Sequence, residues 1–174
     1  MTLAKPANRL FFCFLFFLFW IPLPLGSKLP WASMLLCAIS FLFSTLWCML
    51  YLQNKTALSK SFIQAKFPLL LLIIGQAFVG YQYFFNATID SNATLQQLLL
   101  GISYTCIFAL SLLIINSKKR IKYTIYTLVA SGLFQAVYGS LMTLTGVEYL
   151  LLVEKDAYLG VATGTFVNRN HLAG

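Results

Sequence analysis

The chain has 174 residues, of which 60% are hydrophobic and only 9% are charged, and its formal net charge is +8. Soluble domains carry about 25% charged residues, and a domain of this size leaves much of its surface exposed. The composition therefore excludes an ordinary soluble domain. It predicts an integral membrane protein with an all-α fold, because an open sheet edge in lipid leaves backbone groups without hydrogen bonds.

Five long apolar runs follow one another along the chain. A bilayer core about 30 Å thick requires about 20 mostly apolar residues in a spanning helix. We therefore expect a polytopic transmembrane helical bundle, one membrane domain over residues 1–174. Its five spans are expected at about residues 10–25, 29–52, 67–85, 95–115 and 123–144, followed by a periplasmic segment over 145–174.

The first run follows Lys5 and Arg9, a pattern that a signal peptide shares. No small-residue cleavage site follows this run, and the second span begins within a few residues. We therefore expect the first helix to be retained.

The basic residues are distributed unequally between the two sides of these spans. With the N-terminus inside, nine of the twelve fall on the cytoplasmic side: Lys5, Arg9, Lys55, Lys60, Lys66, Lys118, Lys119, Arg120 and Lys122. Only Lys28, Lys155 and Arg169 fall outside. Because short cytoplasmic loops carry an excess of Lys and Arg, the topology is predicted to be N-in and C-out, with anionic membrane lipid as a partner.

Neither the charge nor the cysteines indicate a soluble partner or a metal. The basic residues are scattered among apolar runs, so no nucleic-acid partner is expected. The four cysteines lie inside apolar runs without a CxxC pair: Cys13, Cys37, Cys48 and Cys106. We interpret them as small buried hydrophobic residues and predict no metal site and no cofactor.

The spans contain no ionisable residue, and their polar residues include Gln76, Gln82 and Gln135. These three are predicted to form hydrogen bonds between helices. The loop between the third and fourth spans contains two Asn-x-Thr triplets, beginning at Asn86 and Asn92. We interpret them as loop and cap residues, with Thr94 or Asn92 capping the fourth helix.

The last fourteen residues, Val161–Gly174, form the longest polar and glycine-rich segment, VATGTFVNRNHLAG. Asn170 before His171, Leu172 and Ala173 is typical of a helix N-cap, and a helix N-terminus attracts anions. Arg169 adds a planar guanidinium suited to phosphate oxygens. We therefore expect Asn168, Arg169 and Asn170 to bind a pyrophosphate or glycan, and His171 to act as a catalytic proton acceptor. The alternative is that Arg169 and His171 are interfacial anchors or simply solvated.

Residues 163–174, TGTFVNRNHLAG, resemble a segment of the O-antigen ligase and O-antigen polymerase family, in which the pattern G-T-F-x-N-x-N-H-x-A-G precedes a further membrane helix. The resemblance covers these twelve residues, and the rest of the chain agrees only in being hydrophobic and multi-spanning. It implies a membrane glycosyltransferase of lipopolysaccharide or polysaccharide biosynthesis. Such an enzyme transfers glycan from an undecaprenyl-pyrophosphate carrier to an acceptor hydroxyl at the periplasmic face of the bacterial inner membrane.

Members of that family have about twice as many spans, with further catalytic residues in a large later periplasmic loop. We therefore expect this chain to be the N-terminal part of a longer polytopic protein and to be inactive alone. Two alternatives stay open at this point: a non-enzymatic segment of a polysaccharide or lipid-carrier transporter, and a structural membrane subunit. Intramembrane charges in further helices would favour transport, and a large polar loop with Arg and His would favour the enzyme.

Overall fold

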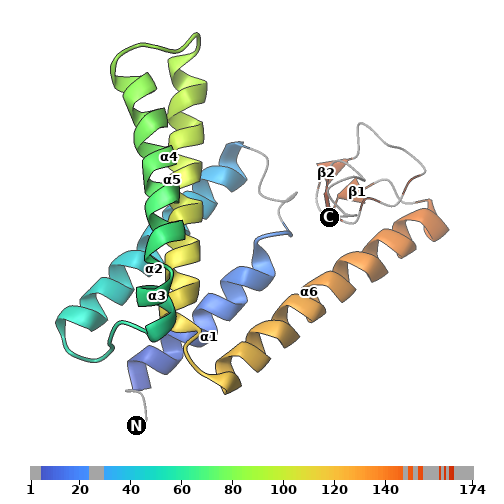
Figure 1. The fold of residues 1–174 in the computed structure, drawn as a ribbon. Coiled ribbons are helices and arrows are strands. Elements are labelled where there is room, and N and C mark those ends of the chain that lie inside the picture. Colours follow the sequence, from blue (N-terminus) through green and yellow to red (C-terminus); the bar gives the residue numbers. More distant parts are fainter. Residues whose placement is uncertain are drawn as a thin grey trace. The chain divides into compact units, whose positions relative to one another are not determined.

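The computed structural model describes residues 5–23, 30–146, 149–150, 153–154, 161, 163 and 165–166. The fold over these residues is all-α except for one pair of two-residue antiparallel strands (Figure 1). The elements in chain order are α1 (Lys5–Trp20), α2 (Pro30–Leu52), α3 (Lys60–Gln64), α4 (Lys66–Phe84), α5 (Ser91–Ile114), α6 (Lys118–Thr145), β1 (Tyr149–Leu150) and β2 (Val153–Glu154).

Within the described part of the chain, four helices are long and apolar enough to cross a membrane: α2, α4, α5 and α6. The chain is therefore a multi-pass membrane protein. The first expected span corresponds to α1, a shorter apolar helix of 16 residues. This helix ends at Trp20, before Pro22, because proline cannot supply the amide that the next helical turn requires. Five crossings and the N-in orientation remain predictions.

The short helix α3 was not expected from the apolar runs. Ser59 caps it, because its hydroxyl oxygen accepts a 3.0 Å hydrogen bond from the amide of Phe62. The same hydroxyl donates to the carbonyl of Leu112 in α5, at 2.6 Å. Ser59 thus both starts α3 and holds it against α5.

Two helices end in the same way, with an asparagine in the left-handed region. Asn54 follows α2 with φ of 55°, and Asn86 follows α4 with φ of 52°. After α2, the amide of Lys55 donates to the carbonyl of Leu50 at 2.9 Å, which is the bond of a Schellman motif. Asparagine tolerates this conformation better than most residues, so Asn86 is a loop residue as predicted.

The N-cap of α5 differs from the expected one. The carboxylate of Asp90 accepts a 3.0 Å hydrogen bond from the amide of Ala93, so Asp90 is the cap. The prediction of Thr94 or Asn92 was wrong, because both lie inside the first turn. The Thr94 hydroxyl instead donates to the carbonyl of Asp90 at 2.8 Å.

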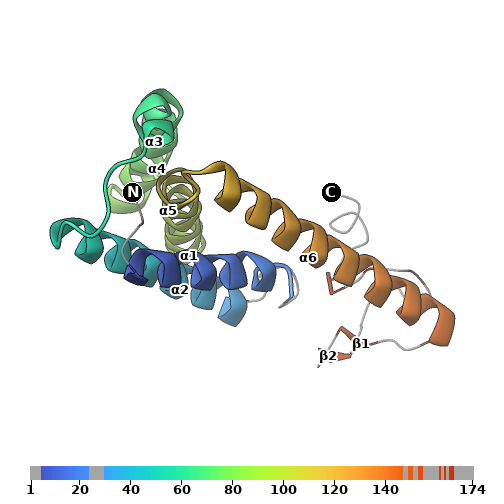
Figure 2. The same cartoon turned by 90° about the horizontal axis from the view of Figure 1, so that it is seen from below.

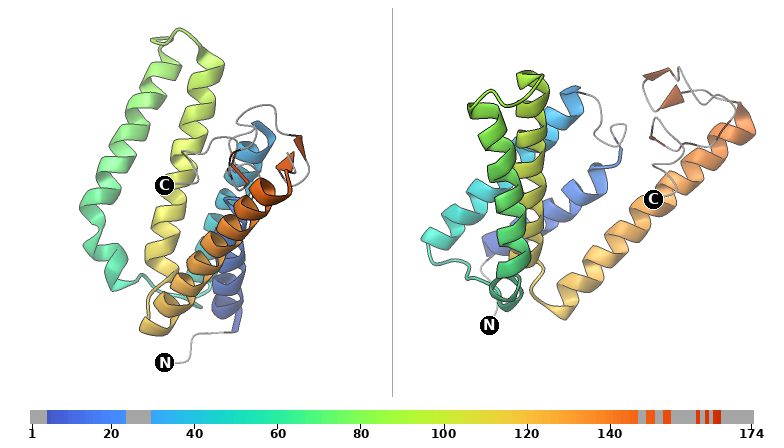
Figure 3. Two further views of the ribbon diagram at one scale, coloured as in Figure 1. Left: turned by 90° about the vertical axis from the view of Figure 1, so that its right-hand side faces the viewer. Right: turned by 45° about the horizontal axis from the view of Figure 1, so that its top comes forward.

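Contacts divide the chain into two compact units, Met1–Phe12 with Met34–Ile121, and Cys13–Ser33 with Lys122–Gly174. In the first unit, α4 and α5 lie side by side as a helical hairpin in every view (Figures 1, 2 and 3). Gly101 of α5 lies directly against the carboxamide of Gln76 in α4, so a Cβ at Gly101 would overlap that side chain. Gln76 therefore lies at the contact between α4 and α5. A small residue such as Gly101 lets two membrane helices approach closely at such a contact.

One end of the first unit is held by a buried arginine. Arg120, in the first turn of α6, is 7% exposed. Its guanidinium donates to the carbonyl of Ile114 at 2.7 Å and to the side-chain oxygen of Asn8 at 2.9 Å. It also lies over the ring of Phe11, with Cζ 4.8 Å from the centroid. Sequence reasoning counted this residue only as a loop cation.

In the second unit, α6 has a polar buried face and an apolar exposed face. Besides Arg120, the buried polar residues of α6 are Thr124, Ser131 and Gln135. The exposed side carries large aliphatic residues, among them Leu128, Val129, Leu133, Val137 and Leu141. This arrangement reverses the pattern of a soluble helix, because lipid contacts the exposed apolar side chains at no cost.

The cysteines were predicted to be buried, and this is wrong for two of them. Cys37 is buried and Cys106 is half-buried, whereas Cys13 and Cys48 are exposed on their helices. All four are free thiols. Cys48 lies in α2, one of the four helices long enough to cross a membrane, whereas Cys13 lies in the shorter helix α1.

Candidate functional site: the Thr165 anchor

The four residues predicted from the sequence to form the site, Asn168, Arg169, Asn170 and His171, lie outside the described residues. The expected helix start at Asn170 lies there too. Of the segment Val161–Gly174, the structure describes four positions: Val161, Thr163, Thr165 and Phe166.

Thr165 is fully buried and is held by two other parts of the second unit. The side chain of Gln135, in α6, donates from Nε2 to the Thr165 hydroxyl at 2.7 Å. The backbone amide of Thr165 donates to Oε1 of the same Gln135 at 2.8 Å. The hydroxyl lies 2.8 Å from the carbonyl oxygen of Pro22, just after α1. We call these three residues the Thr165 anchor.

The chemistry of the groups fixes the direction of these hydrogen bonds. A backbone amide can only donate, so it must face the oxygen of the Gln135 carboxamide. The nitrogen of that carboxamide then faces the Thr165 hydroxyl and donates to it. The hydroxyl has one proton and faces two acceptors, the Pro22 carbonyl at 2.8 Å and Oε1 of Gln135 at 3.0 Å, of which the Pro22 carbonyl is the nearer. Each of these buried polar atoms has a hydrogen-bond partner in this arrangement, as burial requires.

A tight turn surrounds Thr165. The amide of Phe166 donates to the carbonyl of Thr163 at 3.1 Å, which closes a four-residue turn. The hydroxyl of Thr163 is buried and has no hydrogen-bond partner among the described residues. The Thr165 hydroxyl thus has hydrogen-bond partners, whereas the Thr163 hydroxyl has none among the described residues.

Further contacts join α1, α6 and the strands around the anchor. Phe19 of α1 and Phe134 of α6 have ring centroids 6.3 Å apart. The hydroxyl of Ser131, one turn before Gln135, donates to the carbonyl of Phe19 at 3.5 Å. The hydroxyl of Tyr138 donates to the carbonyl of Tyr149 in β1 at 2.8 Å, near the end of α6 where both strands lie (Figure 1). The anchor therefore lies among polar and aromatic contacts that join α1, α6 and β1.

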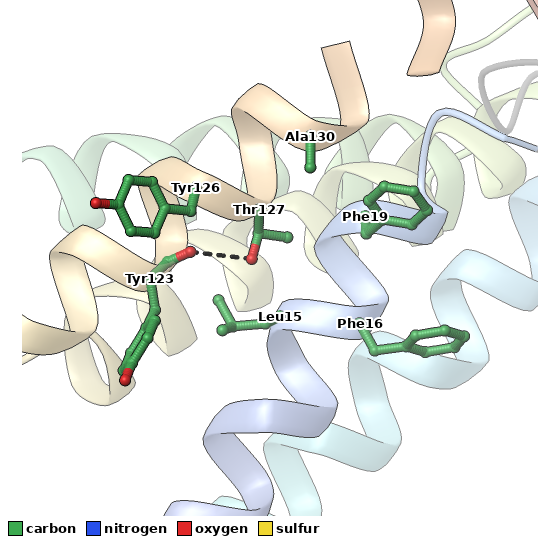
Figure 4. Close-up of a pocket in the computed structure, with 7 residues that line it drawn as sticks. All are labelled: Leu15, Phe16, Phe19, Tyr123, Tyr126, Thr127 and Ala130. Carbon is green, nitrogen blue, oxygen red and sulfur yellow. Dashed lines mark hydrogen bonds between the residues drawn. The ribbon is translucent and has the colours of Figure 1, made fainter. Parts of the chain in front are cut away.

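An open groove of about 360 Å³ lies between α1 and α6. Figure 4 shows its lining, which is Leu15, Phe16 and Phe19 of α1 with Tyr123, Tyr126, Thr127 and Ala130 of α6. The hydroxyl of Thr127 is bonded to the carbonyl of Tyr123 in its own helix, at 3.0 Å. No charged side chain is among these lining residues.

Sequence reasoning identified Gln135 as a polar span residue but assigned it the wrong kind of partner. It predicted a bond to another helix, whereas the observed partner Thr165 lies in a turn after β2. The signal in the sequence was a glutamine inside a span, since buried polar groups require partners. The identity of the partner could not be read, because 30 residues separate the two.

No family model, no curated protein and no solved structure matches the chain.

Proposed function

We propose that the chain is the N-terminal part of an O-antigen ligase-like or polymerase-like glycosyltransferase of the bacterial inner membrane. The observation that carries this proposal is the segment TGTFVNRNHLAG, residues 163–174, which resembles that family. Two structural facts support it. The chain is a multi-pass membrane protein, and Thr165 of this segment is held against the spanning helix α6.

The reaction that we propose is a displacement at the anomeric carbon of a sugar linked to undecaprenyl pyrophosphate. The oxygen of an acceptor hydroxyl forms a bond to this carbon, and the bond between the carbon and the phosphate oxygen breaks. The hydroxyl proton passes to His171, and the lipid pyrophosphate leaves with the electron pair of the broken bond. Asn168, Arg169 and Asn170 bind the pyrophosphate or glycan, so that positive charge and hydrogen bonds stabilise the departing anion.

The test uses the full-length protein in membranes that contain a lipid-linked glycan, with glycan transfer as the readout and protein amount measured by immunoblot. Arg169→Ala should lower transfer about 10- to 150-fold, because a hydrogen bond from arginine to a charged group contributes about 1.5–3 kcal/mol. Arg169→Lys should lower it less, because lysine keeps the charge but loses the planar fork.

Lys155→Ala is the matched control, because it removes another basic residue predicted on the same side of the membrane, outside the motif. It should transfer glycan at the normal rate. Normal transfer by Arg169→Ala as well would contradict the proposed function and would favour the interpretation of Arg169 as an interfacial anchor.

A further inference from the structure

We propose that the groove between α1 and α6 binds one acyl chain of an anionic phospholipid, whose phosphate lies at the ammonium group of Lys122. The residues of this site all belong to the second unit. The inference does not rest on the proposed function, since none of these residues belongs to the segment 163–174. Three observations carry it: the apolar lining of the groove, the position of Lys122 beside it, and the place of the groove near the start of a spanning helix.

The lining of the groove suits a hydrocarbon chain. Its volume of about 360 Å³ lies within the range of about 300–1,000 Å³ that is typical of ligand pockets. The hydroxyl of Thr127 already donates to the carbonyl of Tyr123 in its own helix. The phenol oxygens of Tyr123 and Tyr126 point away from Leu15 and Thr127 (Figure 4). The groove therefore offers mainly carbon atoms to its occupant.

A positive charge lies beside this apolar surface. Lys122 is exposed, and its Nζ lies 5.5 Å from the centroid of the Tyr126 ring. Because Tyr126 lines the groove, this contact places the ammonium group at the edge of the groove. A basic residue near the membrane surface attracts the phosphate of an anionic lipid. The groove and Lys122 thus match the two parts of a phospholipid, an apolar chain and an anionic headgroup.

The sequence of α6 places the groove at the depth that this arrangement requires. The helix begins with the mostly basic run Lys118–Lys122 and becomes largely apolar from Tyr123 on. Tyrosine is enriched where the hydrocarbon core meets the headgroups. From Tyr123 to Ala130 a helix rises about 10 Å, compared with about 30 Å for the whole hydrocarbon core. The groove therefore starts at the level of the headgroups and extends into one leaflet.

The charge of Lys122 also favours a lipid over another protein helix as the occupant. A helix packed into the groove would cover the ammonium group with apolar side chains, and burial of an unpaired charge is costly. A phospholipid brings the opposite charge with it.

The first experiment maps where lipid contacts the protein in phosphatidylcholine vesicles. Trace phosphatidylglycerol or phosphatidylcholine carries a photoreactive diazirine in its acyl chain, and the labelled peptides are identified by mass spectrometry. At Leu15, Phe16 and Phe19, labelling by phosphatidylglycerol should exceed labelling by phosphatidylcholine about 5-fold, which is the contribution of one basic residue. At the exposed residues Leu133 and Val137 of α6, outside the groove, the two probes should agree within about twofold.

The charge is tested by Lys122→Gln, which should reduce the preference for phosphatidylglycerol at the groove to less than about twofold. Lys60→Gln is the matched control, because it removes another exposed lysine predicted on the same side of the membrane. It should keep the preference. Equal labelling of the wild-type groove by both probes, or a preference that survives in Lys122→Gln, would overturn the proposal.

The groove itself is tested by Ala130→Trp, whose indole occupies the place of the acyl chain. This variant should lower the labelling of Leu15, Phe16 and Phe19 by both probes about 5-fold. Val129→Trp adds the same bulk at an exposed neighbour that does not line the groove, so its labelling should stay within about twofold of the wild type. Unchanged labelling in Ala130→Trp would contradict binding in the groove.

Two further outcomes would assign the groove to another occupant and overturn the proposal. One is protection of the groove from both probes together with cross-links between two copies of the chain. The other is displacement of the phosphatidylglycerol probe by undecaprenyl phosphate at a lower concentration than by unlabelled phosphatidylglycerol. Neither outcome bears on glycan transfer by Arg169→Ala, so the proposed function is tested separately.

Discussion

The guanidinium of Arg120 donates a 2.7 Å hydrogen bond to the carbonyl of Ile114, the last residue of α5. The final carbonyls of a helix have no partner within it, and a cation at this end also interacts favourably with the helix dipole. Arg120 therefore caps α5 from the first turn of the following helix. Its second donor reaches Asn8, so the same side chain joins α1 to this junction.

Replacing Arg120 should destabilise the protein. Arg120→Met removes charge-assisted bonds and should lower the free energy of unfolding by about 1.5–3 kcal/mol, or roughly 3–10 °C in Tm. Arg120→Lys should give an intermediate loss, because one ammonium cannot reach both Ile114 and Asn8 as a planar fork does. Thermal unfolding of the detergent-purified protein is the measurement. Lys118→Met is the control, since Lys118 is exposed in the same turn, and an equal loss in this variant would contradict a specific role for Arg120.

The membrane topology can be tested with reporter fusions. Fusions at Asn54 and Ser117 should report the cytoplasm, and fusions at Asn92 and Ala157 should report the periplasm, because nine basic residues lie on one predicted side and three on the other. Two contacts within the first unit are consistent with three of its segments lying on the same side of the membrane: the start of α1, the segment before α3 and the α5–α6 connection. They join Arg120 to Asn8, and Ser59 to Leu112. A periplasmic signal at Ser117 would be incompatible with the five-span arrangement.

Two glycines of the α4–α5 hairpin should respond differently to alanine. A Cβ at Gly101 would overlap the carboxamide of Gln76, so Gly101→Ala must displace this side chain and should lower Tm. A Cβ at Gly75 would meet no atom of a neighbouring group within 4 Å, so Gly75→Ala should leave Tm unchanged or raise it. Thermal unfolding of the two variants, measured side by side, provides the comparison. Recovery of Tm in Gly101→Ala when Gln76→Ala is added would identify the overlap as the cause.

His171 should separate binding from chemistry in the full-length protein. If it accepts the hydroxyl proton, His171→Ala should lower kcat and leave carrier binding nearly intact, as expected for an interaction made mainly in the transition state. The measurements are transfer kinetics and binding of the lipid-linked glycan, at equal protein amounts. A parallel fall of binding and protein level would instead indicate that His171 orders the segment.

The sequence was sufficient to predict the all-α fold and the approximate positions of the long helices, because each apolar run is long and is bounded by polar residues. It was not sufficient for features that depend on tertiary contacts. Arg120 lies in a basic cluster that is typical of a cytoplasmic loop, and its hydrogen-bond partner Asn8 is 112 positions earlier in the sequence. The partner of Gln135 is likewise distant in sequence. Asp90 was missed as a cap because neighbouring Asn and Thr residues are equally good candidates by residue type.

The bond between Arg120 and Asn8 also has a consequence for biogenesis. These residues are 112 positions apart. At a synthesis rate of about 5–20 residues per second, Asn8 leaves the ribosome roughly 6–22 s before Arg120. The N-terminal helix must therefore wait in the translocon or in lipid, without its final partner, while four further helices are made. A chain released before residue 120 would lack the hydrogen bond that Arg120 donates to the carbonyl of Ile114 at the end of α5.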